Sequence, residues 1–265
     1  MEYDPIKDML LKVIKRFPLL RKLFFKALDL LFLRQQYVKR EILKMFSLTR
    51  QIKFYDAGAG FCQYSDFILS RYPNSKVLAS DLKTDYLEAY SSYAQKAYHD
   101  RFQWIAADLT EFVPPEKYDL IAAIDILEHI SEDEKVLANF FQALQPQGKL
   151  IISTPSNWDD TAKFTAEHVR PGYTWNDLRT KLTNAGFIIR GYRYTYGKWG
   201  NCSWKIGIKV PLKLVSYSKF MLLLLPLYYI CLYPIIYLLM KIDLNTYNSK
   251  GNGLLVIAEK PLNAV

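Results

Sequence analysis

The sequence DAGAGFC, residues 56–62, follows a short apolar run and precedes a stretch with helical character. Glycines at a strand-to-helix turn, here Gly58 and Gly60, let a ligand approach the backbone and leave amide N–H groups free at the helix start. A Gly-x-Gly turn alone occurs in many folds, so its meaning depends on the rest of the chain. It predicts a ligand site at the end of a buried strand.

Apolar runs of strand type alternate with helical stretches on the C-terminal side of this turn. The expected strands are residues 52–58, 76–81, 102–108, 118–125, 148–154, 187–197 and 253–260, and the expected helices are about 63–71, 84–98, 131–144 and 174–184. Such alternation predicts an α/β fold with a mainly parallel sheet and helices on both faces. Its ligand should bind beyond the carboxyl ends of the strands, near the switch in strand order.

An acidic residue ends each of the first four expected strands. These are Asp56, then Asp81 25 residues later, then Asp108, and then Asp125 in the sequence DILEH. A carboxylate after the second strand can accept both hydroxyls of a ribose, and the one after the third is placed to accept from an exocyclic amine. Acids that only cap the following helices are the alternative, but four consecutive strand ends favour a nucleoside ligand.

Together these segments resemble the class I S-adenosylmethionine-dependent methyltransferases, most of all the branch with the ubiquinone and menaquinone methyltransferases. The resemblance covers residues from about 50 to 198 and the last strand, through DAGAGFC, SDL, ADL, YDLIAAIDILEHI and LQPQGKLIISTPS. It implies methyl transfer from S-adenosylmethionine and a Rossmann-like, seven-stranded sheet whose last strand runs antiparallel between strands five and six. One departure is Cys62, which stands where the family has a third glycine.

The resemblance also implies roles for the residues at the strand ends. Asp56 with Gly58 and Gly60 would hold the aminocarboxypropyl part of the cofactor, and Asp81 would bind its ribose. The other implied contacts are Leu82 on the adenine ring, Asp108 and Leu109 at the adenine edge, and Asp125 by the methionine end. A nicotinamide dinucleotide would explain the glycines and Asp81, but not Asp108 or the LEH segment. The chain has no Gly-Lys-Ser/Thr for a P-loop.

Two of the three histidines are catalytic candidates. His168 lies in TAEHVRPGY, in the connection after the fifth expected strand, where this fold usually meets its substrate, and Glu167, Arg170 and Tyr173 add a base, a cation and a phenol. An O-methyl acceptor must lose a proton, which a positioned side chain can take. We therefore expect His168, assisted by Glu167, to act as a base, and a structural loop histidine is the alternative.

The DILEH segment supplies His129 and a weaker metal hypothesis. Asp125, Glu128 and His129 can lie together at the end of the fourth strand. In the ubiquinone O-methyltransferases a similar segment is linked to a divalent ion, so the resemblance makes Mg²⁺ a candidate. The alternative, which we favour, is that the site works without metal and that Glu128 and His129 shape the loop beside the acceptor.

Positive charge is concentrated in two regions of a chain whose net charge is +9. Residues 1–50 hold twelve Lys or Arg against five Asp or Glu, and residues 205–241 hold five lysines and no acid. This suggests an anionic partner, either a membrane surface or a nucleic acid. The fourth strand is followed by DILEH and not by a motif of NPPY type for a flipped base, which disfavours nucleic acid.

The run FMLLLLPLYYICLYPIIYLLM, residues 220–240, is uncharged and long enough to span a bilayer. The strand expected at 253–260 must return to the same sheet, which excludes a single pass. Open alternatives are a shallow or re-entrant hairpin bent at Pro226 and Pro234, a helical pair on the membrane surface, or a lid over an apolar channel. An interface with another protein or a second subunit, as in a homo-oligomer, is a further alternative. We favour monotopic attachment, with lysines contacting anionic lipid.

The expected organisation has three parts. Residues 1–48 form basic amphipathic helices, 49–200 and 251–265 form the cofactor domain, and 201–250 form a hydrophobic membrane-associating or lid insertion. We expect a peripheral methyltransferase on the cytoplasmic side of a membrane. Its acceptor would be lipophilic or lipid-linked, such as a quinone precursor, an aryl-polyene or polyketide, or a lipid, with O-methylation favoured. A nucleic-acid methyltransferase and a non-catalytic membrane adaptor remain the alternatives.

Overall fold

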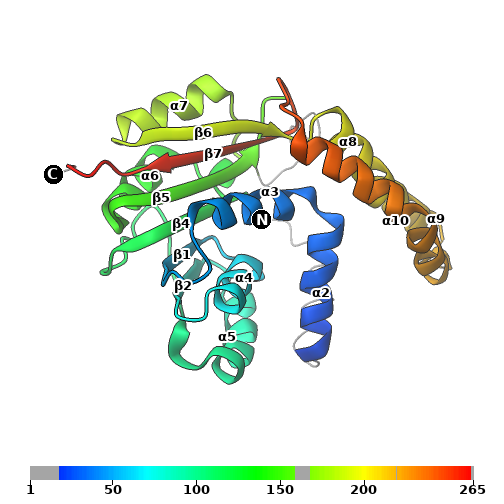
Figure 1. The fold of residues 1–265 in the computed structure, drawn as a ribbon, viewed down its shortest axis with the longest axis horizontal. Helices are drawn as coiled ribbons and strands as arrows, with labels where there is room; N and C mark the ends of the chain where they lie inside the picture. The colour runs from blue at the N-terminus through cyan, green and yellow to red at the C-terminus, as the bar shows by residue number, and fades with distance from the viewer. Residues whose placement is uncertain (1–17, 159–167, 219, 264–265) are drawn as a thin grey trace.

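The computed structural model of the 265-residue chain describes residues 18–158, 168–218 and 220–263. Its centre is a seven-stranded sheet in the order β3-β2-β1-β4-β5-β7-β6 (Figure 1). The strands are β1 (Lys53–Ala57), β2 (Lys76–Asp81), β3 (Phe102–Ala106), β4 (Tyr118–Ile124), β5 (Leu144–Pro155), β6 (Ile188–Thr195) and β7 (Gly253–Glu259). Strand β7 runs antiparallel to both β5 and β6. The expected sheet is confirmed, and its strand order switches between β1 and β4.

Helices cover both faces of the sheet. They are α3 (Leu33–Met45), α4 (Gln63–Arg71) and α5 (Thr84–Tyr98) on one face, and α6 (Asp133–Ala143) and α7 (Trp175–Asn184) on the other. Alternate residues of β4 separate the two cores, because Leu120 packs toward the first group and Ile121 toward the second. Both strand faces are therefore apolar, as expected for a parallel sheet buried on both sides.

The N-terminal region contributes α2 (Pro18–Leu31) and α3, which meet at Phe32. Helix α3 belongs to the sheet domain, since Val38 and Ile42 are fully buried in its core. Helix α2 turns away from α3 and runs along the side of the domain (Figure 1). Helix α2 begins at Pro18, and the part of the expected basic helices before it lies outside the described residues.

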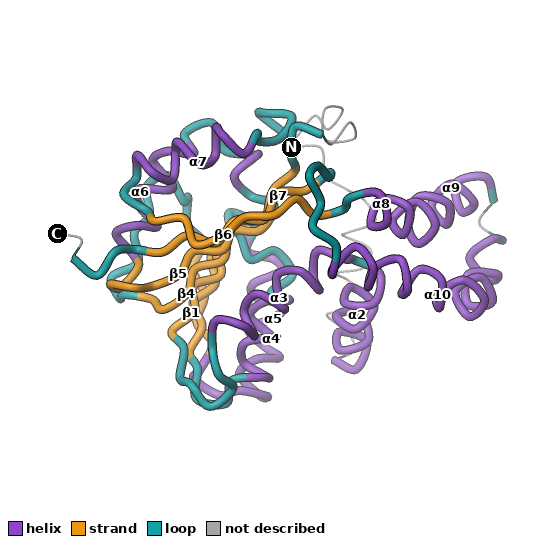
Figure 2. Tube along the Cα trace, turned by 45° about the horizontal axis from the view of Figure 1, so that its top comes forward, coloured by secondary structure: helices purple, strands orange, loops and turns teal. Residues whose placement is uncertain are grey.

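Between β6 and β7 the chain forms a helical hairpin, a name we use for residues 198–217 and 221–245. One arm consists of α8 (Lys198–Trp204), a π-helical turn (Lys205–Lys209) and α9 (Val210–Tyr217), and the other is α10 (Met221–Asn245). The two arms lie side by side and project from the sheet domain (Figures 1 and 2). The insertion thus adds a second structural unit without interrupting the sheet.

Of the open alternatives, a hairpin that turns at Pro226 and Pro234 does not match the structure, because α10 continues through both residues as one helix. The carbonyls that these prolines leave without an N–H partner belong to Leu222 and Ile230, whose side chains are exposed. These turns are therefore not enclosed in a protein core, where such carbonyls would be costly. The chain reverses instead between α9 and α10.

Helix α10 is long and apolar enough to cross a membrane by its length and composition. It has 25 residues, and its most apolar window has a mean hydropathy of 2.1. Only 6% of that window is buried inside the protein, whereas the core helix of a soluble domain would be mostly buried. Most of the apolar surface of α10 is therefore not buried within the described part of the chain.

Asp243 attaches the end of α10 to the sheet domain. Its buried carboxylate accepts hydrogen bonds from Tyr37 Oη of α3 at 2.9 Å and from the Gly200 N–H of α8 at 2.9 Å. A Cβ at Gly200 would lie 2.6 Å from this carboxylate, so only glycine fits there. Three helices therefore meet at one buried acid, which is satisfied by hydrogen bonds.

Candidate active site

The loop after β1 has the conformation that its glycines predict. Gly58 and Gly60 have φ values of +72° and +49°, and a Cβ at Gly58 would lie 2.7 Å from Ile126. Cys62 also has a left-handed backbone, with φ 61°, at the N-cap of α4. Glycine is the residue that adopts this conformation at least cost, which explains the family's preference at the position of Cys62.

Asp56, at the end of β1, is hydrogen-bonded to the helix that follows this loop. Its Oδ2 accepts from the N–H of Ser65 at 3.0 Å and from Ser65 Oγ at 2.6 Å. Burial raises the pKa of Asp56 to about 7, although the Ser65 hydrogen bonds oppose the rise. The observed role of Asp56 is to hold the start of α4, and its direct contact with a cofactor stays a prediction.

Asp81 lies at the carboxyl end of β2 and reaches the glycine loop. Its Oδ2 accepts from the Gly60 N–H at 2.9 Å, and its Oδ1 accepts from the Lys83 N–H at 3.0 Å. The next side chain, Leu82, is 62% exposed and offers an apolar surface beside this carboxylate. Here a ribose could donate its hydroxyls to Asp81, and an adjoining flat ring could pack on Leu82.

The carboxyl end of β3 places Asp108 at the surface. Its Oδ1 accepts from the Thr110 N–H at 2.9 Å and from Thr110 Oγ1 at 2.8 Å, and these bonds lower the pKa of Asp108. Leu109 is buried in the core, so only its backbone can contact a cofactor. Its carbonyl accepts from Asn139 Nδ2 at 2.9 Å, which fixes this turn.

Asp125, at the end of β4, forms an ion pair with Arg34 of α3. The Asp125 backbone has a φ of 52°, and its N–H donates to the Ser153 carbonyl at 2.7 Å. The sequence did not identify Arg34 as a site residue, because it lies in a strongly basic region that indicates a solvated surface. Its contact with Asp125 depends on how α3 packs over the sheet.

Two buried polar atoms near Arg34 have no hydrogen-bond partner among the residues that the structure describes. They are Asp125 Oδ1 and Tyr64 Oη. Burial raises the pKa of Tyr64 and Arg34 opposes the rise, which places the phenol within the field of the same guanidinium. An acceptor and a donor at this end fit the ammonium and carboxylate of an amino-acid group. The site therefore suits the methionine part of S-adenosylmethionine.

Glu128, His129 and His168 form a cluster beside this end of the site. Ligand atoms of the three side chains lie within 4.8 Å of one another, and the two imidazole centroids are 4.6 Å apart. The Val169 N–H donates to the Glu128 carbonyl at 3.0 Å, which ties the loop of His168 to the turn of His129. The fold thus brings together the two histidines that the sequence singled out, 39 positions apart in the numbering.

This cluster differs from the expected metal set. His168 takes the place of Asp125, whose carboxylate pairs with Arg34. Two imidazoles and one carboxylate suit zinc or another transition metal better than Mg²⁺, which prefers oxygen ligands. Glu128 is also buried and accepts from Thr154 Oγ1 at 3.1 Å. The three residues could hold a transition-metal ion, but they give no support to Mg²⁺.

Arg170 and Tyr173 were expected to face the acceptor, and this is wrong. Both bind the buried carboxylate of Asp133, which also accepts from Lys181 Nζ at 2.8 Å. Tyr173 is 1% exposed. The pair belongs to a structural network that anchors the His168 loop to α6 and α7, because a buried carboxylate needs such partners. Glu167 lies outside the described residues.

Comparisons with known proteins agree with this geometry. Residues 55–150 match the family model of a methyltransferase domain. The chain is 26% identical over 135 residues to trans-aconitate 2-methyltransferase of Azoarcus sp. (strain BH72), covering 48% of this chain and 51% of that protein. It is 27% identical over 154 residues to malonyl-[acyl-carrier protein] O-methyltransferase 1 of Ilyobacter polytropus, covering 53% and 54%. The chain spans about half the length of the curated relatives it matches.

A solved structure extends the likeness to the whole fold. Phosphoethanolamine N-methyltransferase 2 of Haemonchus contortus, in complex with S-adenosyl-L-methionine, superposes with a TM-score of 0.59. The match has 19% sequence identity and covers 84% of this chain and 52% of that one. At this identity the likeness concerns the fold, including the sheet that positions the strand-end residues described above.

Proposed function

Because the chain belongs to the class I S-adenosylmethionine-dependent methyltransferase family, we propose that it methylates a lipophilic acceptor at a membrane surface. The observation that carries the cofactor half is the pairing of Asp81 with the Gly60 N–H next to exposed Leu82. In this proposal Asp81 accepts the ribose hydroxyls and Leu82 packs on the adenine. The orphaned Asp125 Oδ1 accepts from the ammonium, and Tyr64 Oη donates to the carboxylate.

When bound, S-adenosylmethionine supplies an electrophilic methyl group on a sulfonium. The residues of the chain then have to orient the acceptor and move its proton. His168 would take the proton from an acceptor hydroxyl, which leaves the acceptor oxygen able to receive the methyl group. His129 lies against the His168 ring and holds its orientation. We favour oxygen as the methylated atom because a hydroxyl needs such a base.

The membrane half of the proposal rests on the helical hairpin. Leu223 and Leu227 of α10 are 72% and 61% exposed, and large exposed apolar surfaces mark interaction sites. Lys205, Lys209 and Lys213 on the other arm are positioned to meet anionic headgroups. Since β7 returns to the sheet after α10, both ends of the hairpin stay on one face of the bilayer. We place that face on the cytoplasmic side.

The proposal is tested by two measurements on the purified chain. Calorimetry should show binding of S-adenosylhomocysteine, and the chain should sediment with phosphatidylglycerol-containing vesicles at high salt. Apolar burial is not screened, whereas a purely electrostatic contact weakens as the Debye length falls to about 3 Å at 1 M salt. Absence of S-adenosylhomocysteine binding would overturn the cofactor half. Release from vesicles by salt would overturn the hairpin as the attachment.

A further inference from the structure

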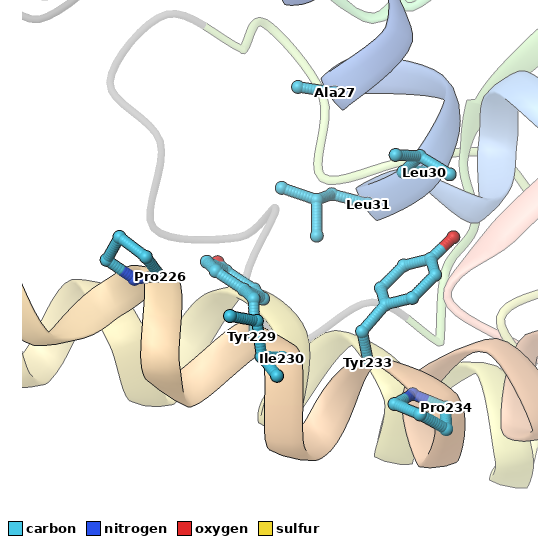
Figure 3. A pocket seen from close by; sticks show the side chains of 8 residues that line it. All are labelled: Ala27, Leu30, Leu31, Pro226, Tyr229, Ile230, Tyr233 and Pro234. Carbon is cyan, nitrogen blue, oxygen red and sulfur yellow. The ribbon is translucent and has the colours of Figure 1, made fainter.

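Helices α2 and α10 flank an open apolar groove of about 430 Å³ (Figure 3). Ala27, Leu30 and Leu31 line it from α2, and Tyr229, Ile230 and Tyr233 line it from α10 together with two prolines. Its volume lies within the range of about 300–1,000 Å³ that is typical of small-molecule sites. We call it the α2–α10 groove. It lies between the hairpin and the helix that leads into the active site.

Helix α2 also packs on the cofactor domain. Phe24 meets Phe61 of the glycine loop edge-on at 5.1 Å, and Phe25 packs near Tyr90 of α5 at 6.2 Å. One helix therefore both lines the groove and contacts the loop after β1. Only three positions separate Leu31 in the groove from Arg34, which pairs with Asp125. An occupant of the groove would thus lie against an element that reaches the methyl-donor end of the site.

The chemistry of the groove walls favours a hydrocarbon chain. Apart from the two carbonyls that the prolines leave without an N–H partner, the backbone groups of both walls bond within their helices, so an extended peptide would bury most of its N–H and C=O groups without partners. Tyr229 Oη already donates to the Gly207 carbonyl at 2.8 Å. Tyr233 Oη is buried without a partner in the described part of the chain, and its ring reaches from α10 toward α2 (Figure 3). The groove therefore offers apolar contact and one hydroxyl.

Charge around the groove indicates where such a chain comes from. The segment 205–241, which contains the α10 wall, has five lysines and no acidic residue. This matches an anionic lipid surface and repels cationic partners. The groove is also continuous with the exposed apolar face of α10, because Ile230 lines the groove and is 74% exposed. A chain can pass from the bilayer into the groove without crossing polar surface.

We propose that the α2–α10 groove binds the aliphatic chain of the methyl acceptor while the polar end of the acceptor reaches the active site. This rests on the proposed function and adds that the acceptor is a single-chain amphiphile whose tail is recognised by the protein. Each CH₂ that enters the groove should raise affinity about fourfold, which corresponds to about 0.8 kcal/mol per buried methylene.

The test uses fatty acids and a fluorescent analogue as probes of chain binding. Dansyl-undecanoic acid should bind the full chain, and octanoate, decanoate and dodecanoate should displace it with affinity rising along the series. Ala27→Trp fills the groove and should weaken binding by at least about tenfold, the effect of losing about two methylene contacts. Leu43→Trp, at an exposed leucine of α3 outside the groove wall, is the control.

Three results would overturn the inference. They are binding of the probe by Ala27→Trp with wild-type affinity, an equal loss of affinity in Leu43→Trp, and no binding of the probe by the wild-type chain. A dimer in solution that Ala27→Trp dissociates would identify the groove as a subunit interface and would also overturn it. S-adenosylhomocysteine binding and vesicle sedimentation, measured on the same samples, separate this outcome from failure of the proposed function. If both persist while probe binding is absent, only the groove assignment fails.

Discussion

The sheet domain and the helical hairpin use the same apolar residue types in opposite ways. In the sheet, Phe54, Ile121 and Val256 are fully buried, whereas Leu223 and Ile230 of α10 are more than 70% exposed. Burial of a large apolar side chain contributes about 1.5–3 kcal/mol, and the hairpin leaves this contribution unused within the chain. The difference fits our proposal, in which the sheet domain carries the chemistry and the hairpin determines where the chemistry takes place.

The largest expected effect tests the hairpin alone. Combining Leu222→Asp, Leu223→Asp and Leu227→Asp should reduce vesicle binding more than about a thousandfold, since three leucines at about 1.5–3 kcal/mol each no longer enter lipid. Co-sedimentation measures the loss, and calorimetry should show unchanged S-adenosylhomocysteine binding. Leu43→Asp, at an exposed leucine of α3, is the control and should bind vesicles normally. If the triple variant still sediments with vesicles, the hairpin is not the part of the chain that binds the membrane.

The next effect concerns catalysis in the sheet domain. His168→Ala should lower turnover by roughly 10²–10⁴ through loss of the base, with vesicle and cofactor binding intact. His99→Ala, at the end of α5, is the matched control and should keep full activity. EDTA should leave the wild type active if His168 works as a base. Loss of activity with EDTA, restored by zinc, would instead make Glu128, His129 and His168 a metal site.

Asp56 should make the stability of the sheet domain depend on pH. Its pKa is about 7 in the folded chain against an ordinary value of 3.8. Between these values the folded state keeps a proton that the unfolded state has lost, so stability falls as pH rises through this window. The loss is at most about 4 kcal/mol, at about 1.36 kcal/mol per pKa unit. Asp56→Asn should flatten the profile.

Urea unfolding of the ligand-free chain at about pH 4 and about pH 8 measures this term. Ser65→Ala is a useful companion, because it removes the hydroxyl that donates to Asp56 and should raise the pKa of that carboxyl further. A wild-type profile that Asp56→Asn leaves unchanged would mean that other groups cause the pH dependence.

The smallest expected effect concerns the ribose contact. Asp81→Ala should weaken S-adenosylhomocysteine binding by about 1.5–3 kcal/mol, or roughly 10- to 150-fold, because two hydroxyls lose a charged acceptor. Asp85→Ala, which removes an exposed acid of α5, is the control for charge alone. Equal affinities in wild type and Asp81→Ala, measured by calorimetry, would contradict the assigned role.

Local sequence patterns were enough to predict the sheet. The second strand and the helices α4 and α5 begin and end where predicted, because each is a short run with one clear period and a turn signal at its ends. The antiparallel return of β7 was also predicted, although through the family resemblance and not from spacing. The predicted strands also gave the positions of their carboxyl ends. Asp56, Asp81 and Asp108 were therefore expected as neighbours at the carboxyl edge of the sheet.

The errors share one physical cause, which is contact between distant parts of the chain. Tyr173 looks like a free phenol in sequence, but the fold places it beside Asp133 in a buried network. Arg34 looks like one basic surface residue among many, but the packing of α3 brings it to Asp125. Pro226 predicts a bend by local rules, yet α10 continues through it as one helix that packs along the other arm of the hairpin.

Asp243 fixes the direction in which the helical hairpin extends from the sheet domain. Because its buried carboxylate binds α3 and α8 at the root of α10, the hairpin cannot swing freely against the sheet. If the hairpin enters lipid as proposed, the distance from the lipid to His168 is set by the length of the two arms. Acceptors would be sorted by how far their reactive atom stands above the hydrocarbon. One extra turn in each arm, about 5.4 Å, should select a longer headgroup with the active site untouched.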